Sequence, residues 1–164
     1  MHTTGRIPLA SRSLGVLAVM AALLVASSGR AESAGDPDRV DKSSNKTFSE
    51  TLKAVEKTVK SEGMMIVAKI DHKNMLSMVG AKIKGSTTIE FGKPDMGKML
   101  LPMNPAIGLE MPAKIYVYES ADGKVVVSYR KVAPGFATYG NPEVTKAGEM
   151  MDMMLEKITS AVTQ

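Results

Sequence analysis

The sequence has no cysteine and no tryptophan, and its 164 residues include only three phenylalanines and four tyrosines. Without cysteine, no disulfide can hold the fold, and the lipid anchor of a bacterial lipoprotein has no attachment point. The scarcity of aromatic side chains also leaves little to stack on nucleic-acid bases. The fold must therefore rest on its own apolar core.

An excess of charge of one sign is missing too, once the first 31 residues are set aside. The whole chain has 21 basic and 17 acidic residues, but Arg6, Arg12 and Arg30 lie in residues 1–31, which contain no acid. The remainder carries 18 basic against 17 acidic residues, a net charge of +1. This balance predicts no nucleic-acid partner, and the net charge gives no support for binding to an anionic membrane surface.

The first 31 residues have the order of an export signal. Arg6 and Arg12 precede an apolar run over residues 16–26, and small residues follow up to Ala31. This order predicts a signal peptide over residues 1–31, cleaved after Ala31 or Ala34, and a periplasmic or secreted product. The apolar run is shorter than the roughly 20 residues that span a bilayer, so we expect no stable membrane anchor.

Residues 32–44 form a polar leader that could include the start of a first strand, and residues 45–164 form a single domain. Thr47 and Glu50 have the spacing of a capping box and predict a helix that ends at Gly63. Pro94 starts a short helix, and Asn141 caps a final one. The apolar stripe of that last helix consists of Val144, Ala147, Met151, Leu155, Ile158 and Val162.

Strands are predicted where β-branched residues gather or alternate with polar ones. These segments are residues 64–70, 83–91, 113–119 and 124–131, with a short helical turn over 71–79, and Asp122-Gly123 forms a hairpin turn between the last two strands. Val55, Val59, Ile66, Val117, Val127 and Ile158 are expected to be buried together. The fold class is α+β, an antiparallel sheet with helices mainly on one face.

Several short motifs resemble a known family. They are Ile70-Asp71, Phe91-Gly92-Lys93-Pro94, Leu109-Glu110-Met111-Pro112, Tyr116-Val117-Tyr118-Glu119, Asp122-Gly123 and Val127-Ser128-Tyr129. Together they resemble the domain-of-unknown-function family 302, in an exported form. The resemblance implies the order strand, helix, four strands, helix, an architecture similar to the TATA-binding-protein fold, and a first strand near residues 38–45. It implies no established activity.

The sequence departs from the family pattern at positions where ligand chemistry could lie. Many relatives have cysteine and asparagine where Ala113 and Lys114 stand, and asparagine where Lys93 stands. An aspartate before the later proline is replaced by Ala133. Whatever those side chains bind in relatives therefore does not carry over to this chain.

No catalytic motif is evident, so no catalytic residue is predicted. Gly80 and Gly85 have the spacing of a phosphate loop without its lysine, and paired acids such as Glu149 with Asp152, or Glu110 with Glu119, are typical of solvated charges. After signal cleavage the chain has a single histidine, His72. The enzyme alternative needs a polar cleft that converges on His72, Asp71 or Tyr129.

Methionine is unusually frequent, with 14 in the chain and 12 after signal cleavage. Soft thioether sulfur suits Cu(I), so Met150, Met153 and Met154, with His72, form a candidate metal site. Met151 belongs to the apolar stripe of its helix, whereas Met153 points away from that stripe. The alternative is that the methionines fill a core that is poor in aromatic residues, or form a partner surface.

These observations favour an exported, non-catalytic domain that binds a small ligand or an unknown protein. Periplasmic Cu(I) binding and an uncharacterised enzyme with a cleft near His72 are the alternatives. No established cofactor is implied, and a homodimer is compatible with the sequence.

Overall fold

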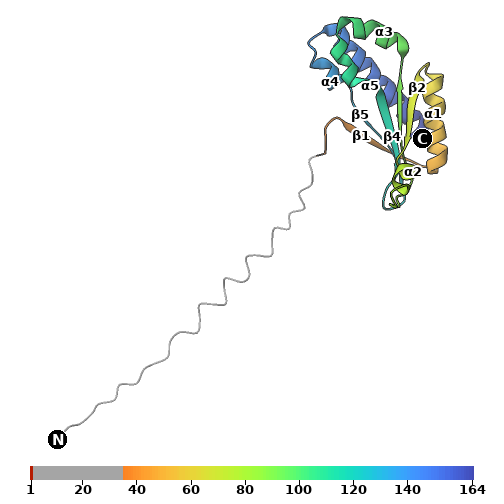
Figure 1. Cartoon of the computed structure of the whole chain (residues 1–164), viewed down its shortest axis with the longest axis vertical. Coiled ribbons are helices and arrows are strands. Elements are labelled where there is room, and N and C mark those ends of the chain that lie inside the picture. Colours follow the sequence, from red (N-terminus) through yellow and green to blue (C-terminus); the bar gives the residue numbers. More distant parts are fainter. Residues whose placement is uncertain (2–34) are drawn as a thin grey trace. The chain divides into compact units, whose positions relative to one another are not determined.

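Five strands form one antiparallel sheet in the order β1-β5-β4-β3-β2. They are β1 Arg39–Ser44, β2 Met65–Asp71, β3 Ser86–Gly92, β4 Ala113–Glu119 and β5 Val125–Arg130. The computed structural model describes Met1 and residues 35–164, and Figure 1 shows how their elements are arranged. The predicted export signal and its cleavage site lie outside the described residues, within residues 2–34.

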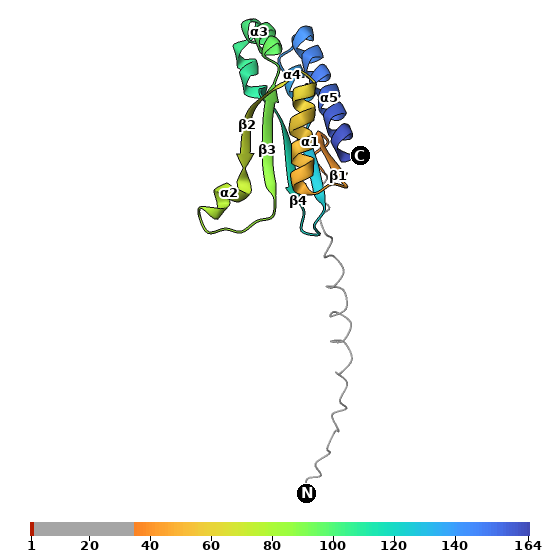
Figure 2. The same cartoon turned by 90° about the vertical axis from the view of Figure 1, so that its right-hand side faces the viewer.

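Two long helices, α1 Phe48–Ser61 and α5 Pro142–Thr163, pack on one face of the sheet (Figure 2). The shorter elements are α2 His72–Ser77, α3 Pro94–Met103, the 3-10 helix η1 Pro105–Glu110, and α4 Ala133–Ala137. The order of the main elements is strand, helix, four strands, helix. This confirms the predicted α+β class, and no described helix is long and apolar enough to cross a membrane.

The core lies between the sheet and the helices α1 and α5. The predicted core residues Val55, Val59, Val117, Val127 and Ile158 are buried in one cluster, and Ile66 packs against it half-buried. Strand alternation produces this layer, because successive side chains point to opposite faces. On β3, for example, Ile89 and Phe91 face the helices while Thr88 and Glu90 face the uncovered side.

The helix ends follow their local signals. The Thr47 side chain accepts from the Glu50 backbone and the Glu50 carboxylate accepts from the Thr47 backbone, which confirms the predicted capping box. Asn141 caps α5 through the backbone N–H groups of Glu143 and Val144. All six predicted stripe residues of α5 are buried.

The first strand expected near residues 38–45 is confirmed as β1, an edge strand paired with β5. Other local details differ from the prediction. Ile83 is exposed and β3 begins only at Ser86. Helix α3, predicted to start at Pro94, extends through Pro102, and Leu100 is its one buried residue. The helix α4 was missed, because the Asp152 carboxylate that accepts its first N–H groups comes from α5.

Candidate functional site

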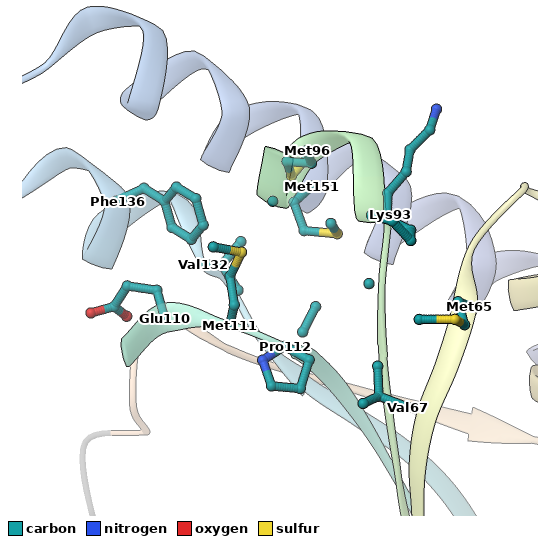
Figure 3. A pocket seen from close by; sticks show the side chains of 14 residues that line it. Met65, Val67, Lys93, Met96, Glu110, Met111, Pro112, Val132, Phe136 and Met151 are labelled. Atoms are coloured by element: carbon teal, nitrogen blue, oxygen red, sulfur yellow. The ribbon is translucent and has the colours of Figure 1, made fainter. Parts of the chain in front are cut away.

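An apolar pocket lies where α3, α4 and α5 meet the ends of β2, β3 and β4 (Figure 3). Its volume is about 210 Å³. The lining consists of Met65, Val67, Gly92, Lys93, Pro94, Met96, Gly97, Glu110, Met111, Pro112, Ala113, Val132, Phe136 and Met151. Almost all of these groups are apolar, so the pocket offers dispersion contacts rather than hydrogen bonds.

Four methionines line this pocket, and each comes from a different part of the chain. Met65 lies on the edge strand β2, Met96 on α3 and Met151 on α5, while Met111 precedes Pro112 across a cis peptide bond. Methionine is flexible and polarizable, so a pocket that it lines can adapt to ligands of different shape. We call this site the methionine pocket.

Val132 and Phe136 form one side of the pocket, and a side chain of α5 holds them in place. The two carboxylate oxygens of Asp152 accept from the backbone N–H groups of Val132, at 2.6 Å, and Ala133, at 3.3 Å. An anion at these N–H groups satisfies donors that the helix itself cannot pair. Asp152, predicted as a solvated charge, therefore holds α4 beside the pocket.

Lys93 and Glu110 are the lining residues with titratable side chains. Their charged ends point away from the middle of the pocket (Figure 3). The carboxylate of Glu110 accepts from the hydroxyl of Tyr139 at 3.3 Å, and partial burial together with this carboxylate raises the pKa of Tyr139. Neither the Lys93 ammonium nor the Glu110 carboxylate is placed to act on a ligand in the pocket's centre.

His72 lies on the opposite face of the sheet, which the long helices leave uncovered. Its Nε2 is 2.8 Å from Thr88 Oγ1, and its ring meets the ring of Tyr116 edge-on at 5.8 Å between centroids. Tyr116 in turn stacks on Tyr118 at 5.0 Å. A groove beside them is lined by Arg39, Ile70, His72, Thr88, Glu90, Lys114, Tyr116, Ser128, Tyr129 and Arg130.

Of the three residues named for the enzyme alternative, His72 and Tyr129 line this groove and Asp71 does not, and the polar groups of Asp71 and Tyr129 are engaged elsewhere. Asp71 accepts from the Asn74 N–H at 2.9 Å and so caps α2. The ring of Tyr129 is buried among core residues, and its hydroxyl donates to Glu156 of α5 at 2.9 Å. Burial raises the pKa of Tyr129, and the hydrogen bond to Glu156 raises it further. Within the described residues, Thr88 is the one hydrogen-bond partner of the His72 ring.

The four candidate metal ligands are also divided between the two faces of the sheet. Met150 and Met153 are 51% and 66% exposed on α5, whereas Met154 is half-buried against the core. His72 lies on the uncovered face and does not join them. No group of three or more histidine, cysteine or acidic side chains suited to a metal occurs in the described part of the chain.

Core packing involves fewer than half of the methionines, since Met96, Met111 and Met154 pack against the core half-buried. Of the twelve beyond the predicted signal, only Met64 and Met151 are buried, and seven are exposed: Met65, Met75, Met78, Met99, Met103, Met150 and Met153. Sequence reasoning missed the methionine pocket because its sulfur-bearing residues are far apart in the chain. Their convergence depends on the packing of α3 and α5 at one end of the sheet.

An antiparallel sheet that is covered by helices on one face and has an apolar pocket at one end defines an α+β domain. A family model described as domain of unknown function DUF302 matches residues 40–162. The chain therefore belongs to the DUF302 family. The solved structure of an uncharacterized conserved DUF302 protein from Bacillus stearothermophilus shares the fold, with a TM-score of 0.70 and 16% identity over 77% of this chain and 99% of that chain.

Curated relatives include proteins named fluoride-specific ion channel FluC 1, from Brucella suis and Brucella abortus, and FluC 2, from Brucella melitensis. Each is 30% identical over 90 residues, which is 55% of this chain. The match covers 35% of the Brucella suis protein and 33% of the other two. The chain thus spans about a third of the length of these relatives.

Proposed function

We propose that this protein is an exported, non-catalytic binding domain, and that its ligand is a small apolar molecule held in the methionine pocket. The observation that carries the proposal is the convergence of Met65, Met96, Met111 and Met151 on one cavity. Apolar concave sites that bury most of a ligand are the usual form of a small-molecule site.

The size of the pocket limits the ligand. A cavity of about 150 Å³ lined by apolar side chains is large enough to bind benzene. The volume of about 210 Å³ here suits a single ring or a short branched chain. Flexible methionine side chains favour tolerance of related shapes over strict selection of one.

A binding role without catalysis agrees with the chemistry of the lining. Catalysis needs an acid, base or nucleophile within hydrogen-bond reach of the reacting atoms. The charged ends of Lys93 and Glu110 point away from the pocket's centre, and His72 lies on the other face of the sheet. Fluoride conduction is not part of the proposal, because the chain matches only about a third of the relatives named as channels.

Methionine methyl groups provide the direct test. With ¹³C-labelled methionine methyls, titration with benzene as a probe should shift the signals of Met65, Met96, Met111 and Met151. The signals of Met75 and Met78 should stay in place, because these residues do not line the pocket. Shifts spread evenly over all methionines would indicate non-specific contact and would count against the proposal.

Exposed sulfur on α5 favours a second candidate, Cu(I) binding by Met150 and Met153. The two side chains lie about one helical turn apart and are both open to solvent, so a soft ion could reach them. Competition titration under reducing conditions should show weaker Cu(I) binding after Met150→Leu with Met153→Leu, at an unchanged thermal midpoint. Leucine keeps similar apolar bulk without the sulfur ligand. Equal affinity in the wild type and the double variant would eliminate this site.

A further inference from the structure

The segment from His72 to Lys84, which we call the α2 arm, extends from the sheet without burying its apolar side chains. No residue of α2 is buried. Met78 and Val79 are 74% and 78% exposed, and Met75, Leu76 and Ile83 are exposed as well. These five large apolar side chains lie close together in sequence on one short protrusion, unlike the single exposed residues that are normal on a protein surface.

The tip of the arm is an ordered turn. Gly80, at φ +79°, donates to Ser77, and the Ala81 N–H donates to the Leu76 carbonyl at 3.0 Å. This pair of bonds is the Schellman arrangement that ends a helix. It presents Met78 and Val79 in a fixed turn, so little conformational freedom is lost when the tip meets a surface.

Three lysines, Lys73, Lys82 and Lys84, lie within the arm, which contains no acid. The acids at its two ends are both engaged: Asp71 is the N-cap of α2, and Glu119 accepts from the Gly85 N–H. The Lys84 ammonium donates to the carbonyls of Ser120 and Ala121 at 3.0 and 2.8 Å, which ties the arm to the β4–β5 turn and keeps the charge. The arm is thus locally basic although the chain beyond the signal is nearly neutral.

We propose that the α2 arm docks on an anionic lipid bilayer, with Met78 and Val79 in the interface and the lysines at the headgroups. Apolar side chains beside lysines are typical of segments that bind at the membrane interface. The aliphatic part of each lysine lies along the apolar layer, while its ammonium group stays in water. Each lysine near an anionic surface adds about fivefold to binding at moderate salt. The contact is reversible adsorption and requires no spanning helix.

A second copy of the chain is a poorer partner for this surface. In a two-fold dimer the same patch meets itself, so the three lysines of one arm would face the three lysines of the other. An anionic membrane supplies both an apolar layer and the opposite charge. The arm and the methionine pocket lie at opposite ends of the sheet, near α2 and α3 respectively (Figures 1 and 2), so this inference is independent of the pocket's ligand.

Vesicle co-sedimentation tests the proposal. The chain from Glu32 is suitable, since the described fold has its own core and the solved relative is covered over 99% of its length by 77% of this chain. We expect binding to phosphatidylglycerol-containing vesicles and about tenfold weaker binding after Met78→Ser with Val79→Ser. The matched control, Met99→Ser with Met103→Ser, removes two exposed methionines from α3, at the other end of the sheet, and should bind as the wild type does.

The charge component is tested separately with Lys73→Ala and Lys82→Ala, which should weaken binding to anionic vesicles about 25-fold together. Pure phosphatidylcholine vesicles should retain little of the wild-type protein. Circular dichroism must show all variants folded. Equal binding by the arm and control variants, or no binding to anionic vesicles, would overturn the proposal. A wild-type dimer that the arm variant converts to monomer, without vesicle binding, would assign the surface to a second copy.

Discussion

Gly148 of α5 lies so close to Phe136 of α4 that a Cβ on the glycine would come within 2.8 Å of the Phe136 Cβ and 2.9 Å of the Ala133 Cα. Such separations are shorter than real Cβ contacts, and the Ala133 atom belongs to the backbone. The absence of a side chain at Gly148 therefore lets α4 approach α5. This contact positions Phe136, which lines the methionine pocket.

Gly148→Ala should consequently destabilise the protein by about 1–3 kcal/mol, the usual cost of overpacking. Urea denaturation measures the change. Gly97→Ala in α3 is the control, because its added Cβ meets nothing within 4 Å and alanine favours helix. A Gly148→Ala protein as stable as the wild type would show that α4 can move away freely.

Truncation of the central core should also be costly. Val117→Ala and Ile158→Ala each remove fully buried methyl groups, so each should lower the free energy of unfolding by at least about 1 kcal/mol. Val79→Ala is a matched surface change, since Val79 is exposed, and should stay within about 0.5 kcal/mol. Thermal midpoints of the two core variants that are no lower than that of Val79→Ala would contradict the packing described.

Glu156 should contribute a pH-dependent part of the stability. Hydrogen bonds from Lys42, Tyr129 and Ser160 lower its pKa to about 2 from an ordinary 4.5. A depressed carboxyl pKa stabilises the fold above the unfolded value, and this stabilisation disappears as the pH falls through the folded value. Because the side chain is partly exposed, solvent screening keeps the effect small.

Denaturation of the wild type and Glu156→Gln between pH 6 and pH 2 tests this. The wild type should be the more stable protein at pH 6, and the difference should shrink between pH 4.5 and pH 2. Glu143→Gln, at an exposed position in the first turn of the same helix, serves as the control for loss of a surface carboxylate. A stability difference that does not change with pH would show that ionisation of Glu156 does not stabilise the fold.

Export predicts a defined N-terminus. The intact mass of the protein recovered from the periplasm or medium should correspond to a chain that begins at Glu32 or shortly after, because residues 1–31 have the charge and hydropathy order of a cleaved signal. A membrane-bound product that retains residues 16–26 would refute both cleavage and release.

The sequence was a good guide wherever one local pattern decides the structure. The 3.6-residue spacing of Val144, Met151 and Leu155 identified the buried face of α5, and the Thr47–Glu50 pair marked the start of α1. The alternation around Val117 and Val127 identified two strands of the central sheet. In each case the signal is contained in the segment that adopts the structure.

Features that depend on distant partners could not be predicted. The start of α4 is stabilised by Asp152, which lies 20 residues after Val132. The four methionines of the pocket are spread from Met65 to Met151, and only the tertiary packing brings them together. His72, paired with α5 on the basis of chemistry alone, proved to lie on the other face of the sheet.

The most direct measurement for ligand binding in the methionine pocket is benzene titration of a pocket-blocked variant. Gly97 lines the pocket and has open space around its missing Cβ, so Gly97→Leu should fill the cavity with little strain. Lys98→Leu adds the same side chain at the next position of α3, outside the lining. We predict that the probe shifts the methyl signals of Met96 and Met151 in the wild type and Lys98→Leu but leaves them in place in Gly97→Leu. Identical shifts in all three folded proteins would contradict binding in this pocket.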